Sequence, residues 1–235
     1  MVLVRVLATP HVEHYTVGLY GALSRSVEVA LVSTRRYGVG VRQFVVPRLP
    51  LPRRSTLLRD AVLRFLSGRF DVVHANSSGE GVLVRGWKRL VVTEHGYPDP
   101  SVVESGLRWY YERERESLVR LGEAGVPIVA ISNYTAAQLR ENLGVKPTRV
   151  IYHGVLDAFR SKGSREAPRK HSVLWVSRLV SFKEPFVLLE AVKRIKGKAD
   201  FAVYLRGDGP LKGEVLRFVR EEGLEGRVKL LDAVP

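Results

Sequence analysis

The sequence predicts an α/β protein of two domains, each with a parallel sheet covered by helices on both faces. Short apolar runs, typical of buried strands, alternate with helix-length segments along the 235 residues. A polar stretch rich in charges and helix breakers, RSKGSREAPRKH, separates two such alternating blocks. We therefore predict an N-terminal domain over 1–160, a linker over 161–171 and a C-terminal domain over 172–235.

In the first domain, apolar runs predict the strands and caps predict the helix ends. Ser55 or Thr56 is a suitable N-cap for one helix, and Asn133 or Thr135 is suitable for another. This second helix is expected to end at Gly144, because glycine is favoured at helix C-termini. The expected strands span 2–8, 27–33, 44–46, 71–75, 90–93, 128–131 and 149–152, and the helices span 16–23, 55–66, 101–122 and the segment that ends at Gly144.

The second block reads as a βαβαβ unit. Its strands are expected at 172–177, 201–206 and 228–231, and its helices at 183–196 and 210–222. Pro210 suits the first turn of the second helix, because proline lacks the N–H that this turn leaves unpaired. In parallel sheets ligands bind beyond the carboxyl ends of the strands, which directs attention to the loops there.

Composition excludes several classes of protein. There is no run of about 18 apolar residues, so we predict no membrane span, and the N-terminus is too short and polar for a signal peptide. The absence of cysteine excludes disulfides and thiolate chemistry, which fits a cytoplasmic protein. Few methionines, asparagines and glutamines accompany this absence, a composition reported for proteins of thermophiles.

Positive charge is concentrated in one segment. The formal net charge is +14, and nine arginines face a single acid, Asp60, between Arg35 and Arg69. The partner could be nucleic acid, a phosphorylated substrate or an anionic membrane surface, which would place the protein peripherally on the inner membrane face. A solvated basic surface explains the segment equally well. Because aromatic residues do not interleave with the arginines, specific nucleic-acid binding is disfavoured.

The helix predicted at 55–66 supplies part of this segment. Its apolar residues, Leu58, Ala61, Val62, Phe65 and Leu66, predict a stripe that packs on the sheet. The alternative is a basic face that meets anionic lipid headgroups.

Two cations stand where the first helix of the second domain should begin. Arg178 and Lys183 follow an apolar strand in VLWVSRLVSFKEP. They would repel each other and the positive helix end unless an anion lay between them, and a diphosphate fits this place. The alternative is a pair of surface cations whose stems cover apolar area.

Three other turns carry candidate residues. Gly207 and Asp208 lie in LRGDGP, where two glycines allow close approach of a ligand. No G-x-G-x-x-G follows the first strand and no P-loop motif occurs, which disfavours dinucleotide oxidoreductases and P-loop ATPases. His95, after a strand in VVTEHGYPD, is suited to proton handling or to hydrogen bonding a sugar or phosphate.

The turn after the first strand, TPHVEHY, suggests a metal site only weakly. Its candidate ligands are His11, Glu13 and His14, and they match no metal-ligand spacing. No Asp-x-Asp pair occurs either, so we predict neither a metal nor another cofactor.

Taken together, six motifs resemble those of the family 4 glycosyltransferases, which have the GT-B architecture of two facing Rossmann-like domains. FDVVHA resembles the family's Asp-x-x-His strand, VVTEHG its Thr-x-His turn and YLRGDGPL its Gly-x-Gly-Pro turn. The segment from IVAISNY to IYHGV resembles one that ends in Asn-Gly-Val, with His153 in the Asn place. VLWVSRLVSFKEPFVLLEAV resembles the Gly-Arg-Leu–Lys-Gly motif, with Ser177 and Glu184 in the glycine places, and GRVKLLDAV resembles the next strand.

The resemblance implies a hexosyltransferase that moves a sugar from a nucleotide-sugar donor with retention of configuration and without a metal. Arg178 and Lys183 would then hold the donor diphosphate, and His95 would contact the donor sugar near the reacting centre. The nucleotide would lie near Gly207, Asp208, Asp232, Ala233 and Val234. The acceptor, by preference lipid-linked or phosphorylated, would bind the first domain, where His11, Glu13 and His14 follow the first strand.

The chain departs from the family's pattern in two places. Many members have a Gly-Gly turn where this chain has PHVEHY, and the Glu-x7-Glu motif would come after the last residue, Pro235. We therefore expect an incomplete second domain, from a truncated chain or one completed by another polypeptide. The alternative function is a non-catalytic remnant that binds nucleotide sugar or anionic lipid.

Overall fold

The computed structural model describes residues 3–47, 52–84, 86–96, 103, 105–156 and 171–232. Within these ranges, the side chains of 52–56, 87, 105 and 107 are not described. Contacts divide the chain into two compact units, Met1–Tyr97 with Trp109–Ser161, and Pro98–Arg108 with Lys162–Pro235. The predicted linker over 161–171 lies outside the described residues, apart from its last residue, His171.

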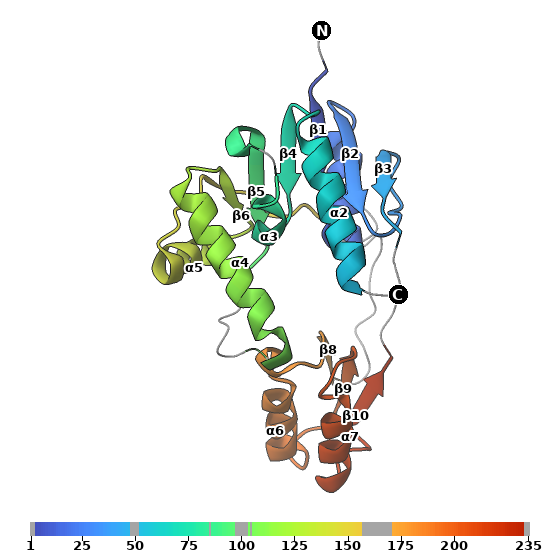
Figure 1. Ribbon diagram of the computed structural model, residues 1–235. Coiled ribbons are helices and arrows are strands. Elements are labelled where there is room, and N and C mark those ends of the chain that lie inside the picture. The colour runs from blue at the N-terminus through green and yellow to red at the C-terminus, as the bar shows by residue number, and fades with distance from the viewer. Residues whose placement is uncertain are drawn as a thin grey trace. The chain divides into compact units, whose positions relative to one another are not determined.

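The first unit contains a parallel sheet of seven strands in the order β3-β2-β1-β4-β5-β6-β7 (Figure 1). Parallel strands are buried on both faces, which is why the apolar runs located them. The strands are β1 Arg5–Ala8, β2 Glu28–Ser33, β3 Arg42–Val45, β4 Val72–Ala75, β5 Leu90–Glu94, β6 Ile128–Ala130 and β7 Arg149–Val150.

Helices pack on both faces of this sheet. Ala30 and Val32 of β2 point into the large core that holds residues of α2, α4 and α5, whereas Val29 and Leu31 point to the opposite face, against α1. Figure 1 shows α2 and α4 on the same side of the sheet. The helices are α1 Glu13–Leu23, α2 Pro52–Ser67, α3 Ser78–Gly81, α4 Ser105–Glu123 and α5 Asn133–Leu143, with a 3-10 turn at Trp87–Arg89.

Two predicted N-caps are wrong. Helix α2 begins at Pro52, three residues before Ser55, because proline is favoured in the first turn of a helix. The cap of α5 is Ser132, whose hydroxyl accepts a hydrogen bond from the Thr135 backbone N–H. The predicted C-terminus of α5 is confirmed, since Gly144 has the left-handed conformation typical of this position. The short helix α3 was not predicted.

The apolar stripe predicted for α2 is confirmed at Val62 and Leu66, which pack in the core, and wrong at Leu58, Ala61 and Phe65, which are exposed. Leu58 and Phe65 are 42% and 64% exposed, while Leu63 and Leu66 are buried. The reason is that Arg59 lies on the inner face, where its guanidinium pairs with Glu80 at 2.7 Å and with Asp60 at 2.9 Å. A neutralised arginine thus occupies a place that hydrophobic periodicity assigns to an apolar residue.

The second unit contains a parallel sheet of three strands in the order β10-β9-β8. The strands are β8 His171–Val176, β9 Phe201–Arg206 and β10 Val228–Leu231, and the helices are α6 Pro185–Ile195 and α7 Lys212–Glu221. One core joins Leu189 of α6 and Val215 of α7 to Val203 of β9. The expectation of helices on both faces is therefore wrong for residues 171–232, because both helices cover the same face.

Helix α6 is preceded by a strained residue. Ser181–Lys183 forms a 3-10 turn, and Glu184 follows with a φ of 49°, the single positive φ of a non-glycine residue in the described part of the chain. The left-handed conformation costs a residue with a side chain about 1 kcal/mol or more. The sequence resemblance places a glycine of the family at this position, and glycine adopts this φ without strain.

We predict that Glu184→Gly stabilises the second unit by about 1 kcal/mol, because the substitution removes this strain. The free energy of unfolding can be measured in urea through the fluorescence of Trp175, with Trp87 and Trp109 replaced by phenylalanine. Glu190→Gly is the matched control, since it places the same residue inside α6 and should destabilise by about 1 kcal/mol. Equal effects of the two substitutions would contradict the strain at Glu184.

Candidate functional site

In the first unit, aromatic and histidine rings meet beyond the carboxyl ends of the strands. His11 follows β1, His95 follows β5 and His153 follows β7. The rings of His11 and His95 stack with centroids 3.8 Å apart and an interplanar angle of 15°. Tyr15 of α1 meets His95 edge-on at 4.7 Å, and His153 lies 5.1 Å from His95. The topology thus gathers residues that are far apart in the sequence at one edge of the sheet.

These rings are held in the uncharged form. Burial, together with the neighbouring His11, His153 and His74, lowers the pKa of His95 to about 3. Burial also lowers the pKa of His74 to about 4 and depresses the pKa values of His11 and His153. Because neutral rings do not repel one another, the stacked arrangement is electrostatically stable near neutral pH.

A buried hydrogen-bond network supports the rings from below. His95 Nε2 lies 3.1 Å from Asn76 Oδ1, and Asn76 Nδ2 lies 2.6 Å from the Tyr20 hydroxyl. The Tyr20 hydroxyl lies 3.0 Å from His74 Nδ1, and His74 Nε2 lies 2.8 Å from Thr93 Oγ1. Sequence reasoning missed Asn76, Tyr20 and Tyr15. Asn76 could have been proposed as a site residue, because it directly follows a predicted buried strand, as His95 does.

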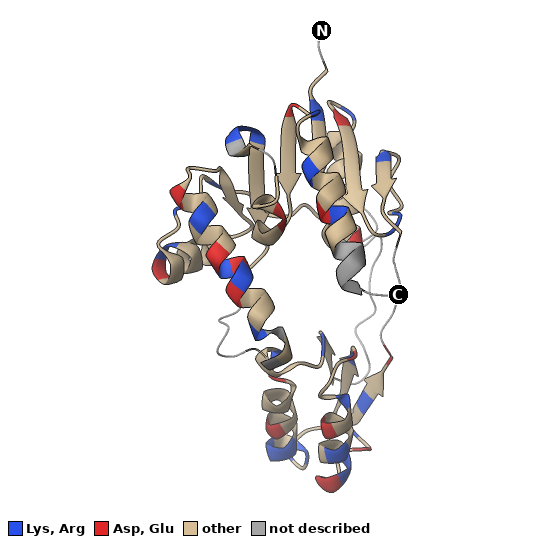
Figure 2. Ribbon diagram, viewed as in Figure 1, with Lys and Arg blue, Asp and Glu red and all other residues tan. Residues whose placement is uncertain are grey.

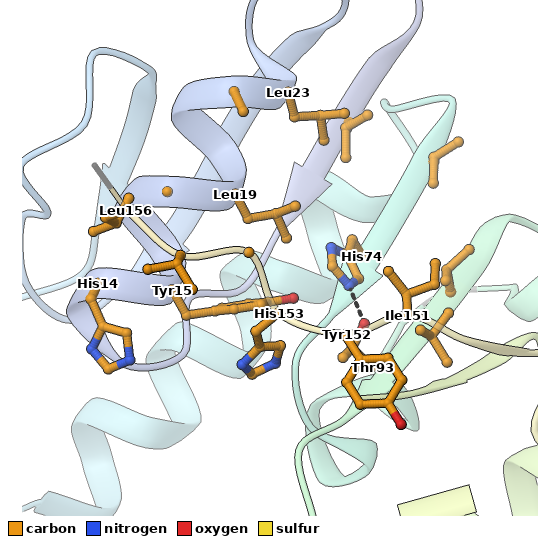
Figure 3. A pocket seen from close by; sticks show the side chains of 18 residues that line it. His14, Tyr15, Leu19, Leu23, His74, Thr93, Ile151, Tyr152, His153 and Leu156 are labelled. Carbon is orange, nitrogen blue, oxygen red and sulfur yellow. Dashed lines mark hydrogen bonds between the residues drawn. The ribbon is translucent and has the colours of Figure 1, made fainter. Parts of the chain in front are cut away.

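The three predicted acceptor-side residues have different surroundings. His11 joins the ring cluster, but Glu13 pairs with Arg35 at 3.1 Å and accepts a hydrogen bond from the Gly38 backbone N–H. His14 lines a cavity of about 780 Å³ between α1, the sheet and the segment after β7 (Figure 3). The structure therefore brings His11 and His95 into contact and turns Glu13 toward the loop at 35–38.

That cavity is mainly apolar. Figure 3 shows Tyr15, His74, Thr93 and His153 among its polar lining residues. Aliphatic side chains form the remaining wall, among them Val6, Leu19, Leu23, Val72, Val91, Val129, Ile151 and Leu156.

Acidic side chains beneath the sheet edge have structural partners. Glu114 binds the Ser78 hydroxyl at 2.7 Å and the Gly79 backbone N–H at 3.1 Å. Burial raises the pKa of Glu94 to about 7, with a further contribution from Glu114, and its carboxylate accepts a hydrogen bond from the Gly96 backbone N–H. In the residues that the structure describes, no group of three or more His, Asp or Glu is placed to hold a metal ion.

In the second unit, Arg178 and Lys183 both lie near the ring of Phe182. The guanidinium carbon of Arg178 is 5.5 Å from the centre of this ring, and Lys183 Nζ is 5.4 Å from it. Both cations are exposed. The prediction that Lys183 begins the helix is wrong, because the left-handed Glu184 separates the 3-10 turn from α6. The two cations nonetheless share one aromatic neighbour.

The glycines of RGDGP permit close backbone contact. A Cβ atom on Gly207 would collide with the Ser177 carbonyl oxygen, and one on Gly209 with that of Leu179. Lys212 Nζ lies 3.9 Å from Asp208 Oδ1 and 3.5 Å from Asp232 Oδ1. Three of the predicted nucleotide-proximal residues, Gly207, Asp208 and Asp232, thus meet at the carboxyl ends of β9 and β10. Ala233 and Val234 lie outside the described residues.

Both units are parallel α/β folds with polar side chains beyond the carboxyl ends of their strands, the place where ligands bind in such folds. The family model described as Glycosyltransferase Family 4 matches residues 12–158, and the chain belongs to this family. The chain is therefore a glycosyltransferase, and the family supports sugar transfer from a nucleotide-sugar donor. The predicted family is confirmed. None of the curated protein sequences matches the chain.

Solved structures share the fold at low identity. A glycosyltransferase from Rickettsia africae has a TM-score of 0.67 and 17% identity, with 99% of this chain and 69% of that chain covered. Anabaena HepE, in complex with UDP and glucose, has a TM-score of 0.71 and 16% identity, with 99% and 70% covered. The lipopolysaccharide outer core galactosyltransferase WaaB has a TM-score of 0.56 and 14% identity, with 99% and 68% covered. The predicted GT-B-like α/β class is confirmed.

We predict that the rings of His74 and His95 stay neutral as the pH is lowered to about 5, since their pKa values of about 4 and 3 lie well below 6.5. Because the unfolded chain binds protons that these buried rings do not, the folded state loses stability as the pH falls from about 6.5 to about 4 for His74 and to about 3 for His95. Histidine NMR titration measures the two pKa values directly. A ring that titrates near 6.5 would contradict its burial in the neutral form.

Proposed function

We propose that this glycosyltransferase transfers a sugar with retention of configuration and without a metal, and that Arg178 and Lys183 hold the donor diphosphate. The observation that carries the proposal is the pair of cations around Phe182 beyond the carboxyl end of β8. Within the described residues neither cation has an acidic side chain at ion-pair distance, so their charges are available to an anion. Arg178 would grip two phosphate oxygens in a fork, and Lys183 would act as a point charge.

The chemistry follows from where charge develops. The nucleoside diphosphate leaves with more negative charge than it has in the donor, so fixed cations stabilise the transition state more than the ground state. The turn around Gly207 and Asp208 would lie beside the nucleotide. HepE was solved with UDP-glucose bound, and a uridine nucleotide is therefore the first donor to test.

We predict that Arg178→Ala and Lys183→Ala each weaken the binding of UDP by about 1–3 kcal/mol, the range for charged hydrogen bonds. Isothermal titration calorimetry measures the change, with ADP and GDP as parallel ligands. Lys198→Ala is the matched control, because this exposed lysine lies beyond the far end of α6. Unchanged affinity in both site variants would refute the diphosphate assignment.

The activity itself is tested by incubating the chain with UDP-glucose and related nucleotide sugars and measuring release of the nucleoside diphosphate. Release that depends on an added acceptor, and that stops in the Arg178→Ala variant, would support the proposal. Release that is unaffected by the substitution would contradict it. The configuration of the product, read by NMR, distinguishes retention from inversion.

We further propose that the outer face of α2 binds an anionic membrane surface, and that this membrane presents a lipid-linked acceptor. Leu57 and Phe65 are 68% and 64% exposed, and Arg69 lies over the ring of Phe65 at 4.3 Å. Figure 2 marks the cations along this helix. Exposed apolar side chains beside arginines are suited to insertion among anionic headgroups. No helix in the described part of the chain has the length and apolar character needed to cross a bilayer.

We predict that Phe65→Glu lowers the affinity for vesicles containing phosphatidylglycerol by about tenfold or more, because it removes the aromatic side chain that would enter the bilayer and adds a charge that the anionic lipids repel. Co-sedimentation measures binding. Val187→Glu in α6, a residue 65% exposed, is the matched control and should have no effect. Equal losses of affinity in the two variants would argue against this surface. Wild-type binding that is equally strong to anionic and to neutral vesicles would argue against it as well.

A further inference from the structure

Asn76 is a buried amide that connects three parts of the first unit. Its backbone N–H donates to Thr9 Oγ1 at 3.0 Å, and its side-chain Nδ2 donates to the Thr9 carbonyl oxygen and to the Tyr20 hydroxyl. Its Oδ1 lies 3.1 Å from His95 Nε2. The residue is 3% exposed, so water does not replace these partners.

The Thr9 carbonyl fixes which way the amide points. A backbone carbonyl oxygen can only accept a hydrogen bond, so the atom of Asn76 that faces it must be the amide nitrogen. The amide oxygen then faces His95 and can only accept. In the neutral ring the hydrogen must therefore be on His95 Nε2, which leaves Nδ1 as an acceptor with a free lone pair.

His95 Nδ1 has no hydrogen-bond partner among the described residues, although the atom is buried. Its ring is surrounded by the stacked face of His11, the edge of Tyr15 and the ring of His153. A buried acceptor without a partner is rare in folded proteins and points to a group that arrives from outside the chain. An acceptor lone pair attracts a hydroxyl hydrogen and repels an anionic oxygen.

We propose that Asn76 is a positioning residue that holds His95 as the Nε2–H tautomer, so that Nδ1 accepts a hydrogen bond from a hydroxyl group of the bound sugar. The proposal rests on the proposed function for the identity of the ligand. The choice of tautomer does not, because it follows from the hydrogen bonds within the first unit. His95 then recognises an uncharged group, whereas Arg178 and Lys183 recognise the diphosphate.

An aspartate at position 76 would also present an acceptor to His95 Nε2, but it would add a negative charge. Both of its oxygens accept, so one would face the Thr9 carbonyl without a hydrogen bond, and the other would favour the protonated ring of His95. Nδ1 would then take up a proton, and lose its capacity to accept, at a higher pH than in the wild type. Ser77→Ala is a matched control in the same loop, because the Ser77 hydroxyl caps α3 and is not bonded to His95.

The test is nitrogen NMR of the chain labelled at its histidine rings. In the wild type we expect His95 Nε2 to have a pyrrole-type signal and Nδ1 a pyridine-type signal at neutral pH. In Asn76→Asp we expect the pKa of His95 to rise by about 1–3 units, the range for a nearby opposite charge. Ser77→Ala should leave both signals and the pKa unchanged. A wild-type ring protonated on Nδ1 would overturn the proposal even if the aspartate variant failed to fold.

A second measurement tests the ligand. The nucleotide sugar that binds in calorimetry should shift the Nδ1 signal of His95, while its nucleoside diphosphate alone should not. A bound nucleotide sugar that leaves Nδ1 unchanged would overturn the hydroxyl contact. If no nucleotide sugar binds, the proposed function fails while the tautomer assignment stands. If donors bind but the tautomer is wrong, the proposed function stands, while the role of Asn76 and the hydroxyl contact at Nδ1 both fail.

Discussion

The hydrogen bonds between Asn76 and Thr9 hold the candidate site of the first unit together. Each residue follows its strand directly, Thr9 after β1 and Asn76 after β4, and both are buried. Loss of one partner would leave buried polar groups unpaired, at a cost of about 1–3 kcal/mol for each group. Because the Tyr20 hydroxyl joins the same network, α1 is also positioned by it. His95 Nε2 then faces the amide oxygen of Asn76, which can only accept a hydrogen bond.

The two units provide different kinds of recognition. Histidines in the first unit are kept neutral by burial, which suits contact with hydroxyl groups and apolar surfaces. The second unit instead presents Arg178 and Lys183 in the exposed, charged form that suits phosphate. Neutral rings and exposed cations are thus separate features, each within its own unit.

Much of the fold could be predicted because burial leaves a pattern in the sequence. The strands Phe201–Arg206 and Val228–Leu231 agree with the sequence prediction, since residues buried in a parallel sheet form short apolar runs. The inner face of α2 could not be predicted, because Arg59 is half-buried there and pairs not only with its neighbour Asp60 but also with Glu80, which only the tertiary structure brings close. The left-handed backbone at Glu184 could not be predicted from the residue type, because glutamate rarely adopts it; the available sign was the family resemblance, which places a glycine there.

The sequence by itself determined the α/β class, the order of the strands along the chain and the two cations of the candidate diphosphate site. These features depend on local hydrophobicity and on residue type, which are present in any short stretch of chain. Only the tertiary structure decided that His11 stacks on His95, that Glu13 turns toward Arg35, and that Asn76 sets the hydrogen bonding of the ring. Such contacts join residues far apart in the sequence, and they follow from the order of strands across the sheet, which hydrophobic patterns along the chain do not specify.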